Sequence, residues 1–228
     1  MLIKAVILDL DGTVAVFNLD YKTVRALVKG YLINKGVPDS ILALKESVFE
    51  MLKKTELWAQ HAGKSDKFLE EVRNHVSNIT EKFELEAAGN TNLLPGVVDT
   101  LKTLKEKDLK IGLCTINSET STNRILERFN VAALFDVVVS RNNVSHVKPD
   151  PEHLETALKL LRVAPGETVF VGDSRIDMRS AKELKAIAVG LPTGVSTIPQ
   201  LMASGANYII TSMSDLPRLL AKLNNAES

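Results

Sequence analysis

The sequence is poor in the features that disulfide bonds, membrane spans and polyanion binding require. Its 228 residues include one cysteine, Cys114, which cannot form an internal disulfide and lies in an apolar run, so we expect a buried, inert thiol in a reducing compartment. No run of about 18 apolar residues occurs, so no transmembrane helix is expected. Lysine plus arginine equals aspartate plus glutamate, at 28 each, so no global basic field points to nucleic acid or to a membrane surface. The first residues lack the layout of a signal peptide, and we expect a cytoplasmic protein.

The stretch from residue 18 to residue 92 has helical patterning only. Apolar residues at helical spacing predict a first helix that carries Val24, Val28 and Leu32. A second helix is expected to start at a cap provided by Asp39 or Ser40, and a third at Ser65. We therefore predict a helical domain over residues 18–92, inserted into a core formed by residues 1–17 and 93–228.

The remainder of the chain alternates apolar strand segments with amphipathic helices. Continuous apolar strands between helices indicate a parallel sheet that is covered on both faces. The predicted fold is therefore α/β, with a doubly wound, mostly parallel, Rossmann-like sheet. The strands expected after the first one, which ends near Leu8, are Lys110–Thr115, Leu134–Ser140, Val169–Val171, Ala186–Val189 and Tyr208–Ile210.

Two carboxylates, Asp9 and Asp11, follow the first apolar strand and precede Gly12. In extended backbone their spacing places both side chains on one side of the sheet, where they repel each other unless a cation lies between them. Oxygen ligands favour Mg²⁺ among the common metal ions. This pattern fits a magnesium site at the end of a strand, but a simple β-turn explains an Asp-Gly pair equally well.

Other polar residues follow other predicted strands. Thr115 ends one strand, Asp173 and Asp177 follow another, and Lys148 lies in a loop before a proline. Because ligands bind beyond the carboxyl ends of the strands of a doubly wound sheet, these groups are expected to converge. Carboxylates that hold Mg²⁺, a cation that offsets phosphate charge, a hydroxyl donor and an aspartate that can attack phosphorus suit phosphoryl transfer.

Each of these residues also has a structural interpretation. Thr115 could cap the following helix, Asp173 could act as an N-cap with Asp177 facing solvent, and Lys148 could be an exposed loop lysine. The four histidines are scattered without metal-ligand spacing, so we expect them to be surface or packing residues.

Taken in order, the motifs resemble those of the haloacid dehalogenase superfamily of phosphohydrolases. The segments that carry the resemblance are Asp9-Leu10-Asp11-Gly12-Thr13, Thr115, Lys148-Pro149 and Gly172-Asp173-Ser174-Arg175-Ile176-Asp177. The helical insert is similar to the C1-type cap of the phosphoglycolate phosphatase-like branch. Two departures stand out: an apolar Val14-Ala15-Val16 follows the first motif, and Ile116 separates Thr115 from Asn117.

The resemblance implies a role for each motif residue. Asp9 would be the nucleophile and Asp11 the general acid and base. Mg²⁺ would be held by Asp9, the Asp11 backbone carbonyl and Asp173, with Asp177 close by. Thr115 and Lys148 would bind the transferring phosphoryl group, and the predicted phosphate-binding residues are Gly12, Thr115, Ile116, Asn117 and Lys148.

The function expected from this resemblance is Mg²⁺-dependent hydrolysis of a small phosphomonoester through an aspartyl-phosphate, as in phosphoglycolate phosphatase. A phosphosugar mutase or a pyrophosphatase of the same family is the alternative, and a non-catalytic binding protein on this fold is the remaining one. The expected partner is a small phosphorylated molecule, with no nucleic acid and no membrane, for a monomer or a homodimer.

Overall fold

The computed structural model describes residues 2–225 and divides them into two compact units. One unit contains the residues up to Asn18 together with those from Ala88 onward, and the other contains Leu19–Ala87. Among the described residues, no helix combines the length and apolar character needed to cross a membrane.

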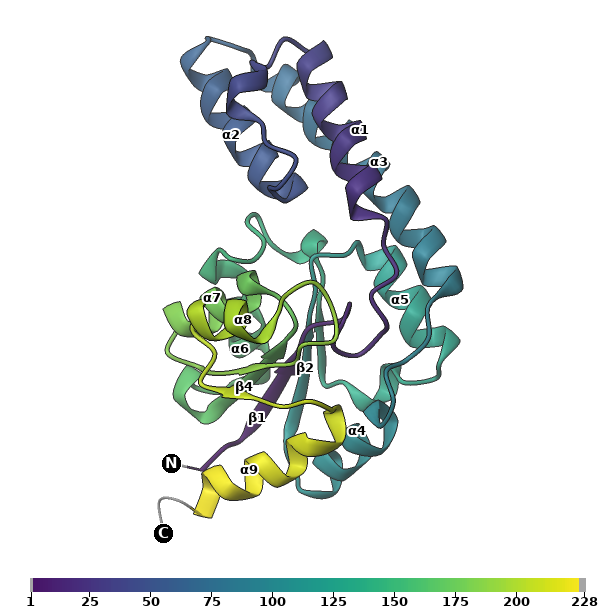
Figure 1. Cartoon of the computed structure of the whole chain (residues 1–228), viewed down its shortest axis with the longest axis vertical. Coiled ribbons are helices and arrows are strands. Elements are labelled where there is room, and N and C mark those ends of the chain that lie inside the picture. The colour runs from purple at the N-terminus through teal and green to yellow at the C-terminus, as the bar shows by residue number, and fades with distance from the viewer. Residues whose placement is uncertain (1, 226–228) are drawn as a thin grey trace. The chain divides into compact units, whose positions relative to one another are not determined.

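The first unit is built on a six-stranded sheet with the order β3-β2-β1-β4-β5-β6 (Figure 1). Every neighbouring pair is parallel, and Leu8 at the end of β1 is in register with Leu113 on one side and Val171 on the other. The predicted α/β, doubly wound fold is confirmed. The strands are β1 Ala5–Leu8, β2 Lys110–Cys114, β3 Val137–Val139, β4 Thr168–Gly172, β5 Ile187–Gly190 and β6 Tyr208–Ile209.

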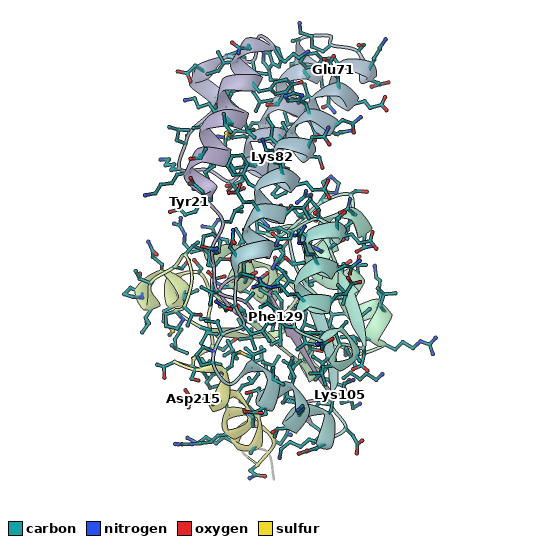
Figure 2. All side chains as sticks on the ribbon, turned by 90° about the vertical axis from the view of Figure 1, so that its right-hand side faces the viewer. Tyr21, Glu71, Lys82, Lys105, Phe129 and Asp215 are labelled. Atoms are coloured by element: carbon teal, nitrogen blue, oxygen red, sulfur yellow. The ribbon has the colours of Figure 1, made fainter. Side chains whose placement is uncertain are left out.

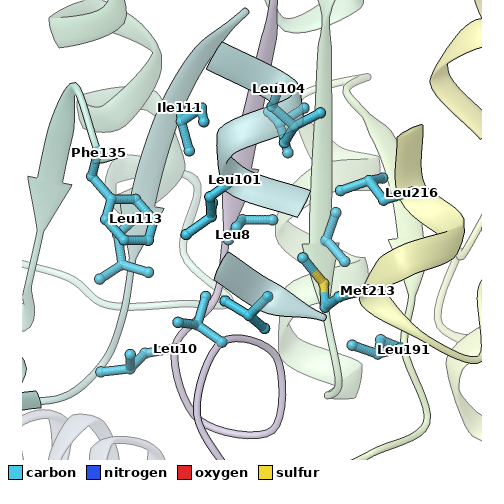
Figure 3. Packing of buried hydrophobic residues seen from close by; sticks show 14 of the residues in the cluster. Leu8, Leu10, Leu101, Leu104, Ile111, Leu113, Phe135, Leu191, Met213 and Leu216 are labelled. Carbon is cyan, nitrogen blue, oxygen red and sulfur yellow. The ribbon is translucent and has the colours of Figure 1, made fainter. Parts of the chain in front are cut away.

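Helices cover both faces of this sheet because its strands are apolar on both sides. Val6 and Leu8 point into a core shared with α4, α5 and α9 (Figure 3), whereas Ala5 and Ile7 point into a core shared with α6, α7 and α8. The helices are α4 Val97–Glu106, α5 Glu119–Arg128, α6 Pro151–Leu161, α7 Arg175–Glu183, α8 Ile198–Ala203 and α9 Leu216–Asn225.

The second unit is helical and has its own small core. It contains α1 Tyr21–Asn34, α2 Val48–His61 and most of α3 Asp66–Asn90. Val28, Leu32 and Met51 are fully buried in this core, while exposed charged residues such as Glu71 and Lys82 lie on the outer surface of α3 (Figure 2). The amphipathic pattern of the sequence therefore gives the expected inward faces.

Several elements of the structure differ from those that the sequence predicts. The second helix starts at Val48, after the cap Ser47, because Ser47 and Glu50 form a capping box, whereas Asp39 begins only a short 3₁₀ turn. The third strand is shorter than predicted, since Ala132–Leu134 forms a 3₁₀ turn before β3. Helix α8 was not predicted, and α3 continues through Asn90, close to the end of the predicted helical domain.

Candidate active site

A buried ion cluster lies where the two halves of the sheet meet. Asp9 directly follows β1, and its backbone N–H continues the ladder by donating to the Val171 carbonyl at 2.9 Å. The Nζ of Lys148 donates to Asp9 Oδ1 at 2.6 Å, to Asp177 Oδ1 at 2.7 Å and to the Cys114 carbonyl at 2.8 Å. Lys148 is 3% exposed, so the predicted alternative of an exposed loop lysine is wrong.

Asp177 is held by the start of the helix in which it lies. Ser174 is the N-cap of α7, and the two residues form a capping box in which the Ser174 N–H and hydroxyl both donate to Asp177 Oδ2, at 3.1 and 2.5 Å. The other carboxylate oxygen accepts from Lys148. Asp177 is therefore buried rather than turned to solvent, and both of its oxygens are engaged by protein donors.

Asp173, at the end of β4, is held by a loop that follows β5. The backbone N–H of Val195 donates to Asp173 Oδ2 at 2.7 Å. A Cβ added at Gly194 would lie 1.9 Å from that same oxygen, and one added at Gly12 would lie 2.7 Å from Asp173 Cγ. Gly12 also has a φ of +77°, and its carbonyl accepts from the Thr193 hydroxyl. Two glycines therefore allow the backbone to close around the Asp173 carboxylate.

The electrostatics of the cluster are dominated by burial. Burial raises the pKa of Asp9 to about 7 against the opposing charge of Lys148, with Asp177 adding to the rise. Burial, followed by the charges of Asp177 and Asp9, holds the pKa of Asp173 well above its usual range. Burial alone would lower the pKa of the Lys148 ammonium, but the two carboxylates outweigh it and raise that pKa.

The remaining motif residues lie beside this cluster. Asp11 Oδ2 accepts from the side-chain amide of Asn117 at 2.6 Å. The Thr115 hydroxyl accepts from the Asn117 backbone N–H at 3.2 Å, and Thr115 N–H donates to the Val139 carbonyl at 2.9 Å. Ile116 is half-buried, and its carbonyl accepts from the Arg141 guanidinium. Ser118, not Thr115, is the N-cap of α5, so the predicted capping alternative for Thr115 is wrong.

The donor set fits a hard divalent cation. Ligand oxygens of Asp9, Asp173 and Asp177 lie within 4.8 Å of one another, and all three residues are buried. Among the residues that the structure describes, the ammonium of Lys148 is the cation that contacts this group, through Asp9 and Asp177. Buried carboxylates that outnumber their cationic partners are costly unless they are protonated or a further cation is bound, which agrees with the raised pKa values of Asp9 and Asp173.

Comparison with known proteins identifies the family of this chain. A family model described as haloacid dehalogenase-like hydrolase matches residues 3–185. The chain belongs to the haloacid dehalogenase-like hydrolase family.

Individual proteins and solved structures are also similar to this chain. Pyrophosphatase PpaX of Bacillus mycoides is 28% identical over 230 residues, which cover 98% of this chain and 100% of that protein. Phosphoglycolate phosphatase of Escherichia coli is 35% identical over 130 residues, 57% of this chain and 52% of that protein. The crystal structure of a hydrolase from Pseudomonas syringae shares the fold, with a TM-score of 0.67 at 23% identity over 96% of this chain and 99% of that one. The predicted family resemblance is confirmed, and with it the class of enzyme, a hydrolase of this family.

A second group of metal-ligand types lies away from the family motifs. His146, Asp150 and Glu152 bring their ligand atoms within 4.8 Å of one another at a more exposed position. Their contacts are local: Glu152 accepts from the N–H groups of Ser145 and His146, and Asp150 caps α6. These contacts are those of a capped helix N-terminus, and they explain why the three side chains lie close together.

Several groups that shape the hydrolase site had not been identified from the sequence. The Val195 N–H and Gly194 reach the cluster from a segment without a recognised motif, and the Cys114 carbonyl reaches it from the residue before Thr115. Buried His153 accepts from the Lys148 backbone N–H through Nδ1 at 3.4 Å, and its Nε2 lies 3.3 Å from the Val139 carbonyl. Two features of the sequence could have indicated these groups. Thr193-Gly194 comes just after an apolar strand, and His153 lies on the apolar face of the helix that follows Lys148.

Proposed function

We propose that this hydrolase is a Mg²⁺-dependent phosphatase that hydrolyses a small phosphomonoester through an aspartyl-phosphate on Asp9. The observation that carries the proposal is the convergence of Asp9, Asp173, Asp177 and Lys148 in one buried cluster next to Asp11 and Thr115. The family, whose matched relatives include proteins named as phosphatases, supports the same reaction class.

Asp9, the Asp11 backbone carbonyl and Asp173 would hold the metal. Asp177 would act through its neighbours, since Lys148 and Ser174 already occupy its oxygens. A bound Mg²⁺ supplies positive charge that offsets the negative charge of the transferring phosphoryl group. Its charge would also favour the ionised forms of Asp9 and Asp173.

The side chains of the protein carry out the reaction in two steps. A carboxylate oxygen of Asp9 attacks phosphorus, the bond from phosphorus to the leaving oxygen breaks, and Asp11 gives that oxygen its proton. Asp11, now ionised, takes a proton from a water molecule, the water oxygen attacks phosphorus, and the bond to Asp9 breaks to release phosphate. Thr115 and Lys148 would bind the phosphoryl oxygens in both steps, through a hydroxyl and an ammonium.

The helical unit is proposed to be the cap domain of this enzyme. It is inserted directly after the segment that carries Asp9, Asp11 and Gly12, so the chain links it to the nucleophile by a short connection. In this role, residues of the predicted domain 18–92 would contact the substrate beyond its phosphate and set specificity.

A pyrophosphatase is the second candidate, because the relative named PpaX matches along its whole length, whereas the relative named phosphoglycolate phosphatase matches over about half. Pyrophosphate and a phosphomonoester such as phosphoglycolate are both small and anionic, and hydrolysis of either would use the same nucleophile. The leaving group is phosphate for pyrophosphate and an alkoxide for the phosphomonoester.

The experiment is a phosphate-release assay on the full chain with phosphoglycolate, sugar phosphates, pyrophosphate and p-nitrophenyl phosphate, each with Mg²⁺ or with EDTA. We expect turnover only with Mg²⁺ and a loss of at least about a thousandfold in Asp9→Asn. Asp99→Asn, at an exposed position on α4, is the matched control and should turn over normally. Mass spectrometry of acid-quenched enzyme should find a phosphoryl adduct on the peptide that carries Asp9.

Undiminished phosphate release by Asp9→Asn would refute the nucleophile. Turnover that persists in EDTA would refute the metal requirement. The preferred substrate in the panel decides between the two candidates.

A further inference from the structure

The side chain of Asn117 makes a short contact with the predicted acid and base of the reaction. Its Nδ2 lies 2.6 Å from Asp11 Oδ2, and Asn117 itself is buried. Asn117 follows β2, whereas Asp11 follows β1, so the contact joins the ends of two neighbouring strands. A hydrogen bond from an amide to a carboxylate is charge-assisted and stronger than one between neutral groups.

The backbone of Asn117 is fixed on both sides, which makes its side chain a defined support. Its N–H donates to the Thr115 hydroxyl at 3.2 Å, and its carbonyl accepts from the Arg141 N–H at 3.2 Å. The Arg141 guanidinium in turn donates to the Ile116 carbonyl at 3.2 Å. The loop after β2 is therefore tied to the loop after β3, and Asn117 extends from this frame toward Asp11.

The contact engages one of the two oxygens of the Asp11 carboxyl group. The side-chain amide of Asn117 donates to Oδ2 at 2.6 Å, so the rotamer of Asp11 is constrained from the end of the neighbouring strand.

We propose that Asn117 is a positioning residue that holds Asp11 in the orientation required for proton transfer to the leaving group. This inference rests on the proposed function, and it gives Asn117 a role other than the phosphate contact expected from the sequence. Without the amide, the Asp11 side chain would sample other rotamers, and the proton would less often point at the leaving oxygen. Attack by Asp9 would be unaffected when the leaving group departs without a proton.

The test compares kcat/KM for two phenyl phosphates in Asn117→Ala and in the unsubstituted enzyme with Mg²⁺. The nitrophenolate of p-nitrophenyl phosphate leaves without a proton. The phenolate of phenyl phosphate is more basic, so its departure depends on a proton from Asp11. Because kcat/KM includes only the steps up to release of the phenol, later hydrolysis of the phosphoenzyme does not affect it. We expect a fall of about tenfold or more for phenyl phosphate and of less than about threefold for p-nitrophenyl phosphate.

Asn123→Ala, an exposed asparagine on α5, is the matched control and should change neither value. If the alanine variant does not fold, Asn117→Ser keeps a polar group in the loop but is too short to reach Asp11, and the same ratio is measured. Equal losses for both substrates would indicate a purely structural role and overturn the proposal, as would unchanged values for both. Failure of the proposed function is separate, since it would appear as full activity of Asp9→Asn on p-nitrophenyl phosphate.

Discussion

Replacement of Lys148 by methionine would remove the ammonium that contacts the buried carboxylates. Lys148 contacts Asp9 and Asp177 at 2.6 and 2.7 Å, and its side chain is almost fully buried. Methionine has a similar length and no charge, so the change leaves the packing volume nearly constant. In metal-free protein, the carboxylates would then have lost their shared cation.

The expected loss in free energy of unfolding is about 3–5 kcal/mol at pH 7, the usual cost of removing one partner from a buried ion pair. The folded variant can reduce this loss by binding a proton on one of the carboxylates. Placing a proton at pH 7 on a carboxyl group of ordinary pKa, roughly 3.9, costs about 4 kcal/mol, so the loss should not exceed this by much. A carboxyl group whose pKa is higher in the folded than in the unfolded protein stabilises the fold most at a pH below its unfolded pKa. This stabilisation is lost as the pH rises through the folded pKa. The parent also binds protons between pH 7 and pH 5, since the pKa of Asp9 is already about 7, so the gap in stability between variant and parent should narrow only through protons that the variant binds in addition.

The assay is urea unfolding followed by far-ultraviolet circular dichroism in EDTA at pH 7 and pH 5. Lys159→Met is the matched control, because Lys159 pairs with Glu155 at 3.4 Å on the surface and should contribute less than about 1 kcal/mol. If Lys148→Met loses no more free energy of unfolding than this control at pH 7, the argument that the ammonium balances the cluster is wrong.

Two further predictions concern groups that lie behind the cluster. Gly194→Ala should weaken Mg²⁺ binding about tenfold or more in isothermal calorimetry, because its Cβ would lie 1.9 Å from Asp173 Oδ2, whereas Gly30→Ala, where a Cβ meets nothing, should leave the affinity unchanged. Burial, followed by the charge of Lys148, lowers the pKa of His153 to about 3, so the protein should lose stability as the pH falls from about 6.5 toward 3. His153→Gln should flatten that part of the pH profile of unfolding, and an equally steep acid loss in this variant would contradict the assignment.

The polar residues that follow β1 and β4 could be predicted to share a site because each follows an apolar strand in the local sequence. The apolar run before Asp9 and the one before Asp173 define the two strands, and parallel strands bring their carboxyl ends to one edge. The sequence could not give the partners of Asp173 and Asp11. The contacts from Val195 and Asn117 depend on loops that close between segments far apart in the chain.

The differences between the predicted and the observed helices have local causes. Leu44 continues the apolar spacing of α2 backward toward Asp39, but it is 54% exposed and lies outside the helix. The capping box of Ser47 and Glu50 was a clearer signal for the start. Helix α8 has six residues, too few for a periodic pattern, although Thr197 and Gln200 carry its capping box.

The position of β1 in the middle of the sheet has a consequence for synthesis on the ribosome. This strand is made before the other five, but its two neighbours, β2 and β4, are made only after the whole helical unit. Until Thr168–Gly172 has emerged, the apolar Ala5–Leu8 segment has an open edge, and nascent chains are exposed to mispairing. Fragments that end before Asp173 would therefore be expected to engage chaperones and to be unable to acquire the metal.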